Sequence, residues 1–321
     1  MSRIYLHSLH LGYEECLRQG FSFLGGAGLV RSSDRVAIKP NLTFPVFRKG
    51  VMTNPDAVEA LVIYLKQFTN HITICESDSG GYNRFSMDEV FATTGLSDVA
   101  KRYGVSIVNM SHVPSRPILF RYHFKQFSVP LPRLLLDETD LFITMPVPKV
   151  HSNTGVSISL KNQWGVIQQP ELRLRLHPYF NEVVYRINKA LPRSISIVDG
   201  KYGLTRSGPM RGDALDLGWL LMGDDIYSVD LVVCTLMGQD YRKVPHLRHA
   251  FIKERTAPID HLTFNTDYKQ FISTGFYLDR AWTDYPGYFT FNSRCLAYVG
   301  YESILAKPLH WLLYKFREPF Y

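Results

Sequence analysis

The residues best suited to chemistry lie in one stretch of the chain, from Asp140 to Gly165. An apolar run, Leu141 to Met145, is followed by two prolines, then by Lys149 and His151, and then, ten positions after the histidine, by Lys161. Because proline cannot continue a hydrogen-bonded ladder, this pattern predicts a buried strand that enters a loop. Burying these polar groups unpaired would cost roughly several kcal/mol each, so we expect them either in water or gathered in a site. We favour the site.

Polar residues also follow other apolar runs of the chain. They are Lys39 and Asn41 after the first run, Glu76 and Ser77 after the second, Asp199 after a later one, and Asn162 beside Lys161. Open α/β sheets bind ligands at the carboxyl ends of their strands, so we expect these side chains to share one site. Each has a structural alternative as well, because Glu76 and Asp199 can also cap the turns that follow them.

Three lysines against two carboxylates make such a site net positive, which suits a carboxylate or phosphate ligand. Crowded ammonium groups lower one another's pKa, which would leave a lysine neutral and nucleophilic, and histidine carries protons near neutral pH. We therefore assign catalytic roles to His151, Lys161, Lys149, Glu76 and Asp199, and substrate binding to Lys39, Asn41, Ser77, Asn162 and Arg206. The loop from Ser77 to Gly81 is a weaker candidate for wrapping a phosphate with backbone N–H groups, since it matches no Walker or Rossmann pattern.

Alternating strands and helices must position these residues, which predicts an α/β fold with a mainly parallel sheet covered by helices on both faces. The predicted strands are 35–38, 72–75, 105–108, 141–145 and 195–198, and the predicted helices are 12–28, 54–65, 86–103, 178–190 and 225–237. An antiparallel excursion is expected over 113–134, and a loop over 200–212.

We expect an α/β core domain over residues 1–260 and an aromatic-rich extension over 261–321 that ends in an amphipathic helix. The spacing of Leu309, Leu312, Leu313 and Phe316 predicts that helix. We interpret it as a terminal helix packed on its own domain; a membrane-surface helix or a partner-binding helix is the alternative.

The composition supports a large globular core, with 45% hydrophobic and 20% charged residues in 321. A net charge of +7 attracts anions, but the basic residues are scattered, which favours a small anionic ligand over nucleic acid. The four cysteines are far apart and form no CxxC pair, so we expect buried thiols and no iron–sulfur cluster. No signal peptide and no run of 18 apolar residues is present, and we expect a cytoplasmic protein with no transmembrane segment.

Several motifs resemble, in order, the family known as domain of unknown function 362, over about residues 35–237. They are IKPNL from Ile38, TNPDAVEALV from Thr53, Glu76-Ser77, PKVHSNTGVSISLKNQWG from Pro148, IVDG from Ile197, and Gly208-Pro209 with Gly212. Some members of that family carry a ferredoxin-like cysteine cluster, which this chain lacks.

The loop more remotely resembles the nickel-pincer lactate racemase family, in which a catalytic histidine precedes by ten positions a lysine that holds the pincer nucleotide. That resemblance would give His151 and Lys161 these roles and His177 a metal-binding role. The glycine-rich lead into the lysine is replaced here by Val156 to Leu160.

Our first hypothesis is an enzyme for an anionic small molecule, which moves protons as an isomerase, lyase or cyclase, in a biosynthetic setting. A redox accessory protein that binds a cofactor or metal is the second hypothesis, and a nucleic-acid binder is the third. The sequence leaves the cofactor, a homodimer and a redox partner open. No nucleophile–base–orienter triad can be read from it, and it does not identify the substrate.

Overall fold

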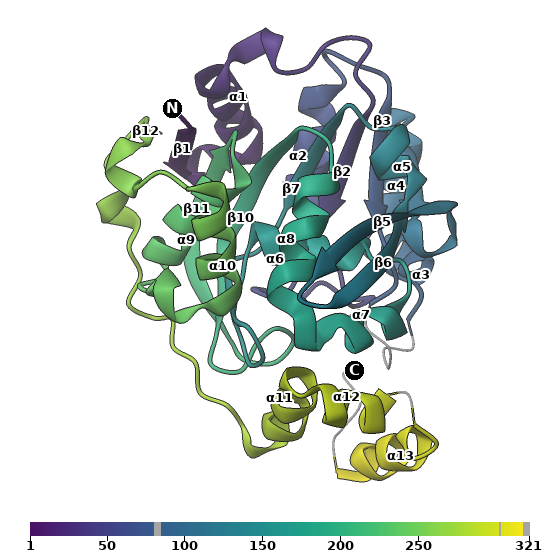
Figure 1. The fold of residues 1–321 in the computed structure, drawn as a ribbon. Coiled ribbons are helices and arrows are strands. Elements are labelled where there is room, and N and C mark those ends of the chain that lie inside the picture. Colours follow the sequence, from purple (N-terminus) through teal and green to yellow (C-terminus); the bar gives the residue numbers. More distant parts are fainter. Residues whose placement is uncertain (80–84, 302, 317–321) are drawn as a thin grey trace.

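The computed structural model describes residues 1–79, 85–301 and 303–316. Its main sheet runs in the order β12-β1-β11-β10-β7-β2-β3-β4 (Figure 1). The strands along that path are β12 (Thr263–Phe264), β1 (Arg3–Ser8), β11 (Asp213–Gly223), β10 (Ser194–Thr205), β7 (Leu141–Met145), β2 (Val36–Pro40), β3 (Ile72–Glu76) and β4 (Ser106–Asn109). Two short strands, β8 (Lys149–His151) and β9 (Gly155–Ser157), pair with each other, and β8 joins β10.

The centre of the sheet is parallel, as the sequence predicts. β10, β7, β2, β3 and β4 are neighbours in parallel register. Every residue of β2 and β7 is buried, which is typical of parallel strands that are covered on both faces. The carboxyl ends of β2, β3 and β7 therefore lie side by side and point to the same edge of the sheet.

Helices cover both faces of the sheet. One face packs against α1 (Gly12–Leu24), α2 (Pro55–Leu65), α3 (Met87–Thr93) and α4 (Leu96–Tyr103). The other packs against α6 (Ser159–Asn162), α8 (Phe180–Ala190), α9 (Ile226–Leu236) and α10 (Pro245–Glu254). The hairpin of β5 (Ser115–Tyr122) and β6 (Lys125–Pro132), with α5 (Arg133–Asp137), forms the predicted antiparallel excursion, as a separate two-stranded sheet.

Local signals explain where several helices begin and end. Asn54 caps α2 by accepting a hydrogen bond from the Asp56 N–H, and Pro55 takes the first helical position. Asp225 caps α9 in the same way. The single helix predicted over 86–103 is wrong: Gly95 adopts φ 81°, a left-handed conformation that ends α3 and starts α4.

The predicted loop over 200–212 is also partly wrong. β10 continues to Thr205 and pairs antiparallel with β11, with a register shift between Gly200 and Tyr202. Gly200 is needed there, since a Cβ would lie 2.1 Å from the Trp219 ring. A glycine inside a strand pattern marks such a close approach as readily as a turn. The sequence analysis did not predict β1 or α10.

The chain beyond residue 260 has two parts. The first stays on the core: β12 pairs with β1, Phe276 is buried, and Leu278 forms a bridge with Arg206. This attached part lies beyond the predicted boundary at residue 260. The second part is a unit of three helices, α11 (Tyr285–Asn292), α12 (Arg294–Tyr301) and α13 (Ala306–Phe316), which lies next to α7 (Pro170–Leu176) (Figure 1).

Candidate functional site

The centre of the candidate site is a buried ion pair between two strand ends. Lys39 at the end of β2 places its Nζ 2.7 Å from Oε2 of Glu76 at the end of β3. The side chains are only 1% and 5% exposed. Removing either partner would leave an uncompensated buried charge, so the pair is costly to break. The parallel register of β2 and β3 brings these residues together.

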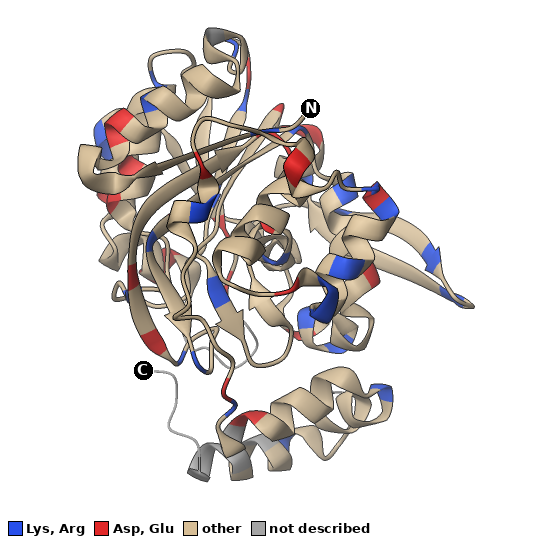
Figure 2. Cartoon of the chain, turned by 90° about the vertical axis from the view of Figure 1, so that its left-hand side faces the viewer, with Lys and Arg blue, Asp and Glu red and all other residues tan. Residues whose placement is uncertain are grey.

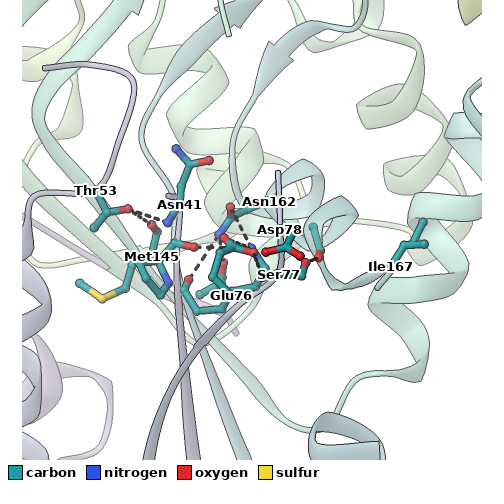
Figure 3. A network of polar contacts seen from close by, with 12 residues as sticks. Asn41, Thr53, Glu76, Ser77, Asp78, Met145, Asn162 and Ile167 are labelled. Carbon is teal, nitrogen blue, oxygen red and sulfur yellow. Dashed lines mark hydrogen bonds and ion pairs between the residues drawn. The ribbon is translucent and has the colours of Figure 1, made fainter. Parts of the chain in front are cut away.

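Asn162 connects this pair to the neighbouring strand (Figure 3). Its Nδ2 donates to Thr144 Oγ1 at 2.8 Å, and its Oδ1 accepts from Lys39 Nζ at 3.5 Å. The short helix α6 carries Asn162, and Asp230 on α9 holds that helix by accepting hydrogen bonds from the backbone N–H groups of Ser159 and Leu160, at 2.8 and 2.9 Å. Burial raises the pKa of Asp230 to about 7.

A second buried cation, Arg173, organises the loops around the pair. Its guanidinium donates to the backbone oxygens of Ile167 at 2.8 Å, Asp78 at 2.7 Å and Gly165 at 3.1 Å, and to Ser77 Oγ at 2.6 Å. Ser77 in turn donates to the Gly165 carbonyl. Arg173 is therefore a structural cation that ties two loop segments, at residues 77–78 and 165–167, to α7. The sequence analysis missed it, because an arginine among the alternating residues of α7 looks like part of a solvated helix face.

Gly165 is required beside the ion pair. A Cβ at this position would lie 3.0 Å from both Glu76 Oε1 and Lys39 Nζ. We expect Gly165→Ala to destabilise the protein by about 1–3 kcal/mol, the usual cost of overpacking a well-packed site.

Urea unfolding measures this change, and Gly28→Ala is the matched control, because a Cβ there meets no atom within 4 Å. A Gly165→Ala variant as stable as the control would show that the ion pair can move aside at no cost.

Lys149 is a buried lysine that forms no ion pair with any described acidic residue. Lys149 is only 3% exposed, and its Nζ donates to the Val51 carbonyl at 2.7 Å. Burial, followed by the charges of Lys161 and Lys39, lowers the pKa of Lys149 to about 7. Burial is therefore the main cause of the lowered pKa, and the crowding of lysines that the sequence predicts adds to it.

His151 lies close to this lysine and is held as a neutral ring. Its Nδ1 accepts a hydrogen bond from the Asn153 N–H at 3.0 Å, which places the proton of the neutral tautomer on Nε2. Burial, followed by the charge of Lys161, lowers its pKa well below the ordinary value. His151 therefore presents one N–H donor in its neutral form.

Lys161 is half-buried and lies beside a cluster of aromatic rings. Its Nζ lies 5.3 Å from the centre of the Phe180 ring. Burial, followed by the Arg173 charge, lowers the pKa of Lys161 to about 7. This aromatic cluster consists of the stacked and edge-on rings of Trp164, His177, Phe180, His246 and Phe291.

Several residues of this cluster, or next to the site residues along the chain, have buried polar atoms without a hydrogen-bond partner in the described part of the chain. They are both amide atoms of Gln163, both ring nitrogens of His246, Nδ1 of His177 and Oδ1 of Asn153. Gln163 is fully buried. Buried polar groups are almost always paired in native proteins, so Gln163 and the two histidines are candidates to bind a polar ligand or water. Asn188, Tyr227 and Thr256 have buried unpaired atoms as well. The sequence analysis missed Gln163 and His246, because neither lies at a strand end.

The structure does not gather every predicted residue. Asn41 lies at the border, where its Nδ2 donates to the same Val51 carbonyl that Lys149 uses, at 2.6 Å. Asp199 is instead a structural group: it accepts from Tyr13 Oη and from the Asn54 N–H, each at 2.8 Å. It thereby ties α1 and the start of α2 to β10, and burial raises its pKa.

Arg206, Ser77 and the predicted phosphate loop also differ from the prediction or lie partly outside the described residues. Arg206 is on the surface and pairs with Asp213 at 2.9 Å. Ser77 serves the Arg173 network, whereas Gly80 and Gly81 of the predicted phosphate loop lie outside the described residues.

The described residues contain no group of three or more His, Cys, Asp or Glu side chains placed to hold a metal ion. His177 stacks on Phe291 of α11, with ring centres 4.3 Å apart, and its pKa is lowered to about 3 by burial and the Lys161 charge. It therefore lies among the aromatic rings as a neutral ring, and the described residues provide no group of metal ligands around it.

Fold and site together define an α/β protein with a cluster of buried cations and aromatic rings near the carboxyl edge of a mainly parallel sheet. The chain belongs to the family described as Domain of unknown function (DUF362), whose model matches residues 36–235. This confirms the resemblance that the sequence motifs indicate.

Individual known proteins are more distant. The chain is 25% identical over 233 residues to the thylakoid-associated protein sll1697 of Synechocystis sp., covering 69% of each. Among solved structures, it is similar to the lactate racemase apoprotein from Thermoanaerobacterium thermosaccharolyticum (12% identity, TM-score 0.41, 61% of this chain) and to a Thermotoga maritima protein (13% identity, TM-score 0.35, 58% of this chain). The chain spans 50% of the length of each of these two structures.

Within the described residues, none of the helices has both the length and the apolar character needed to cross a bilayer.

Proposed function

We propose that this protein is a small-molecule enzyme that acts on a carboxylate- or phosphate-bearing substrate by acid–base chemistry, as an isomerase, lyase or cyclase. One observation carries the proposal: Lys149 and Lys161 have pKa values lowered to about 7 and make no ion pair within the described chain, next to a neutral His151. Perturbed groups of this kind collect at active sites, because catalysis needs acids and bases that exchange protons near neutral pH.

In this proposal the two lysines have complementary tasks. An anionic substrate would raise the pKa of whichever ammonium it contacts, which offsets the cost of burying that charge. The other lysine, when neutral, can take a proton from a carbon or oxygen next to the anionic group. His151 can donate from Nε2, since Nδ1 is occupied by the Asn153 N–H.

The Lys39–Glu76 pair supports this arrangement without taking part in proton transfer. Both groups are already saturated by short contacts, with Lys39 Nζ on Glu76 Oε2 and the Ser77 N–H on Glu76 Oε1 at 3.0 Å. The Glu76 carboxylate raises the pKa of Lys149 while Lys39 and Lys161 lower it. In this proposal the pair influences the pKa of Lys149, which is a positioning role rather than the catalytic role predicted for Glu76.

The unpaired polar atoms favour a ligand that is polar as well as anionic. Gln163 can both donate and accept, and His246 can do either through its two ring nitrogens. A substrate with hydroxyl or carbonyl groups besides its anionic group would satisfy them. The aromatic rings beside Lys161 would hold an apolar or planar part of the same molecule.

The first test is a thermal-unfolding screen with carboxylate and phosphate metabolites, followed by turnover assays on those that raise the melting temperature. We expect His151→Ala to fold normally and to lose about 10²–10⁴-fold in turnover, the usual contribution of a positioned acid or base. His71→Ala, at an exposed histidine, is the control. Full activity in His151→Ala would contradict the assigned role.

Intact mass, metal content and absorption of the natively purified protein test the cofactor alternatives. Added mass on Lys161 together with nickel would favour the pincer hypothesis, and a coloured or metal-containing protein without turnover would favour the redox accessory role. We propose a cytoplasmic location and a biosynthetic role. Cell fractionation tests the location, because the Synechocystis relative is named as thylakoid-associated.

A further inference from the structure

The three-helix unit α11–α13 and the segment leading into it expose many large apolar side chains. Ten of them, between residues 282 and 312, are 39–94% exposed: Trp282, Tyr285, Phe289, Leu296, Tyr298, Ile304, Leu305, Leu309, Trp311 and Leu312. Scattered apolar residues are normal on a protein surface, but such a concentration on one small unit marks an interaction site.

One side of this unit is attached to the core, and the ten apolar side chains stay exposed in spite of that contact. Phe291 of α11 stacks on His177, Arg294 of α12 lies 4.6 Å from the centre of the Tyr179 ring, and Ala297 is buried. Arg280, which precedes the unit, donates to the Ser152 carbonyl at 2.7 Å. The unit is attached to the protein, so detachment does not explain why these apolar side chains are exposed.

The charge of the unit suits an anionic partner. Residues 285–316 include Arg294, which lies against the core ring of Tyr179, and beyond it two basic residues, Lys307 and Lys315, against one acidic residue, Glu302, a small excess of positive charge. Figure 2 shows few charged residues on this unit, whereas both signs are scattered over the core.

The residue types favour a lipid surface among anionic partners. Tryptophan and tyrosine concentrate where a protein meets the polar boundary of a bilayer, and short basic, apolar helices lie in that boundary. The described helices are too short to span a bilayer, so the unit would lie on the membrane. We propose that the outer side of α11–α13 docks this protein reversibly on an anionic lipid bilayer. This inference is independent of the proposed enzymatic function.

The test is flotation of the full-length protein with vesicles of phosphatidylcholine and phosphatidylglycerol, compared with vesicles of phosphatidylcholine alone. We expect binding to the anionic vesicles that weakens in high salt, with a blue shift of tryptophan fluorescence as Trp282 and Trp311 leave water. Ile304→Asp with Leu305→Asp should reduce binding by about tenfold or more, because both side chains lose apolar contact and add repulsive charge.

Ile252→Asp is the matched control, since Ile252 is a 71% exposed apolar residue on α10. It should bind like the unchanged protein. Two results would overturn the proposal: no binding to anionic vesicles, or equal binding by the Ile304/Leu305 variant and the unchanged protein. If that variant instead abolishes a dimer seen by light scattering while vesicles are not bound, the surface is an interface between two copies and the lipid proposal is wrong.

Discussion

Replacing Lys149 with methionine is expected to stabilise the fold at about pH 6 by about 2–4 kcal/mol. Burial and neighbouring cations lower the pKa of Lys149 from 10.5 to about 7. Each pKa unit corresponds to about 1.4 kcal/mol, so the buried charge costs up to about 5 kcal/mol below pH 7. The loss of a hydrogen bond worth about 1 kcal/mol offsets part of the gain. The Val51 carbonyl keeps its bond from Asn41 Nδ2.

The pH dependence distinguishes this explanation from simple packing. Between about pH 7 and 10.5 the unfolded chain binds more protons at Lys149 than the folded chain does, so the stability of the unchanged protein rises with pH through this window. The advantage of Lys149→Met should therefore shrink as pH rises and vanish near the upper limit. Lys161 remains in the variant and contributes a smaller residual slope, because it is half-buried and partly screened by solvent.

Urea unfolding at several pH values measures both effects, with Lys101→Met at an exposed position on α4 as the control. If the gain in unfolding free energy is equal at all pH values, the effect comes from apolar packing. The absence of a gain would mean that the structure stabilises the charged form of Lys149. If Lys149 binds the anionic ligand, as we propose, the variant should also lose the stabilisation that such a ligand provides.

Replacing Glu76 with glutamine should destabilise the protein by about 3–5 kcal/mol, the usual cost of removing one partner from a buried ion pair. The replacement preserves the shape of the side chain but leaves Lys39 without its carboxylate, in a region that also holds Lys149 and Arg173. The Glu76 charge supports the protonated forms of both of these residues. The loss of the Glu76 charge therefore affects Lys149 and Arg173 as well as Lys39.

A double variant, Lys39→Met with Glu76→Leu, separates the charge effect from the loss of shape. Removing both charges should cost less than Glu76→Gln alone, because no buried charge is left unpaired. Chemical unfolding of Lys39→Met, of Glu76→Leu and of the double variant gives the coupling energy. A Glu76→Gln variant within about 1 kcal/mol of the unchanged protein would show that water or Asn162 already compensates Lys39.

The sequence by itself determined the parallel centre of the sheet and the edge at which Lys39, Glu76, Lys149 and His151 meet. These features are local: apolar runs that end in polar residues make strands with polar carboxyl ends, and parallel neighbours bring those ends together. The caps of α2 and α9 are equally local, since Asn54 and Asp225 bond to backbone groups two or three residues away.

Other features depended on contacts between residues that are distant along the chain, and only the tertiary structure decided them. A carboxylate at a strand end has the same sequence pattern whether it lines a site or caps a helix. Glu76 faces Lys39, whereas Asp199 faces Tyr13 and the start of α2. The membership of Arg173, Gln163 and His246 in the site depends in the same way on how α7, α8 and α10 pack, and no short-range pattern predicts that packing.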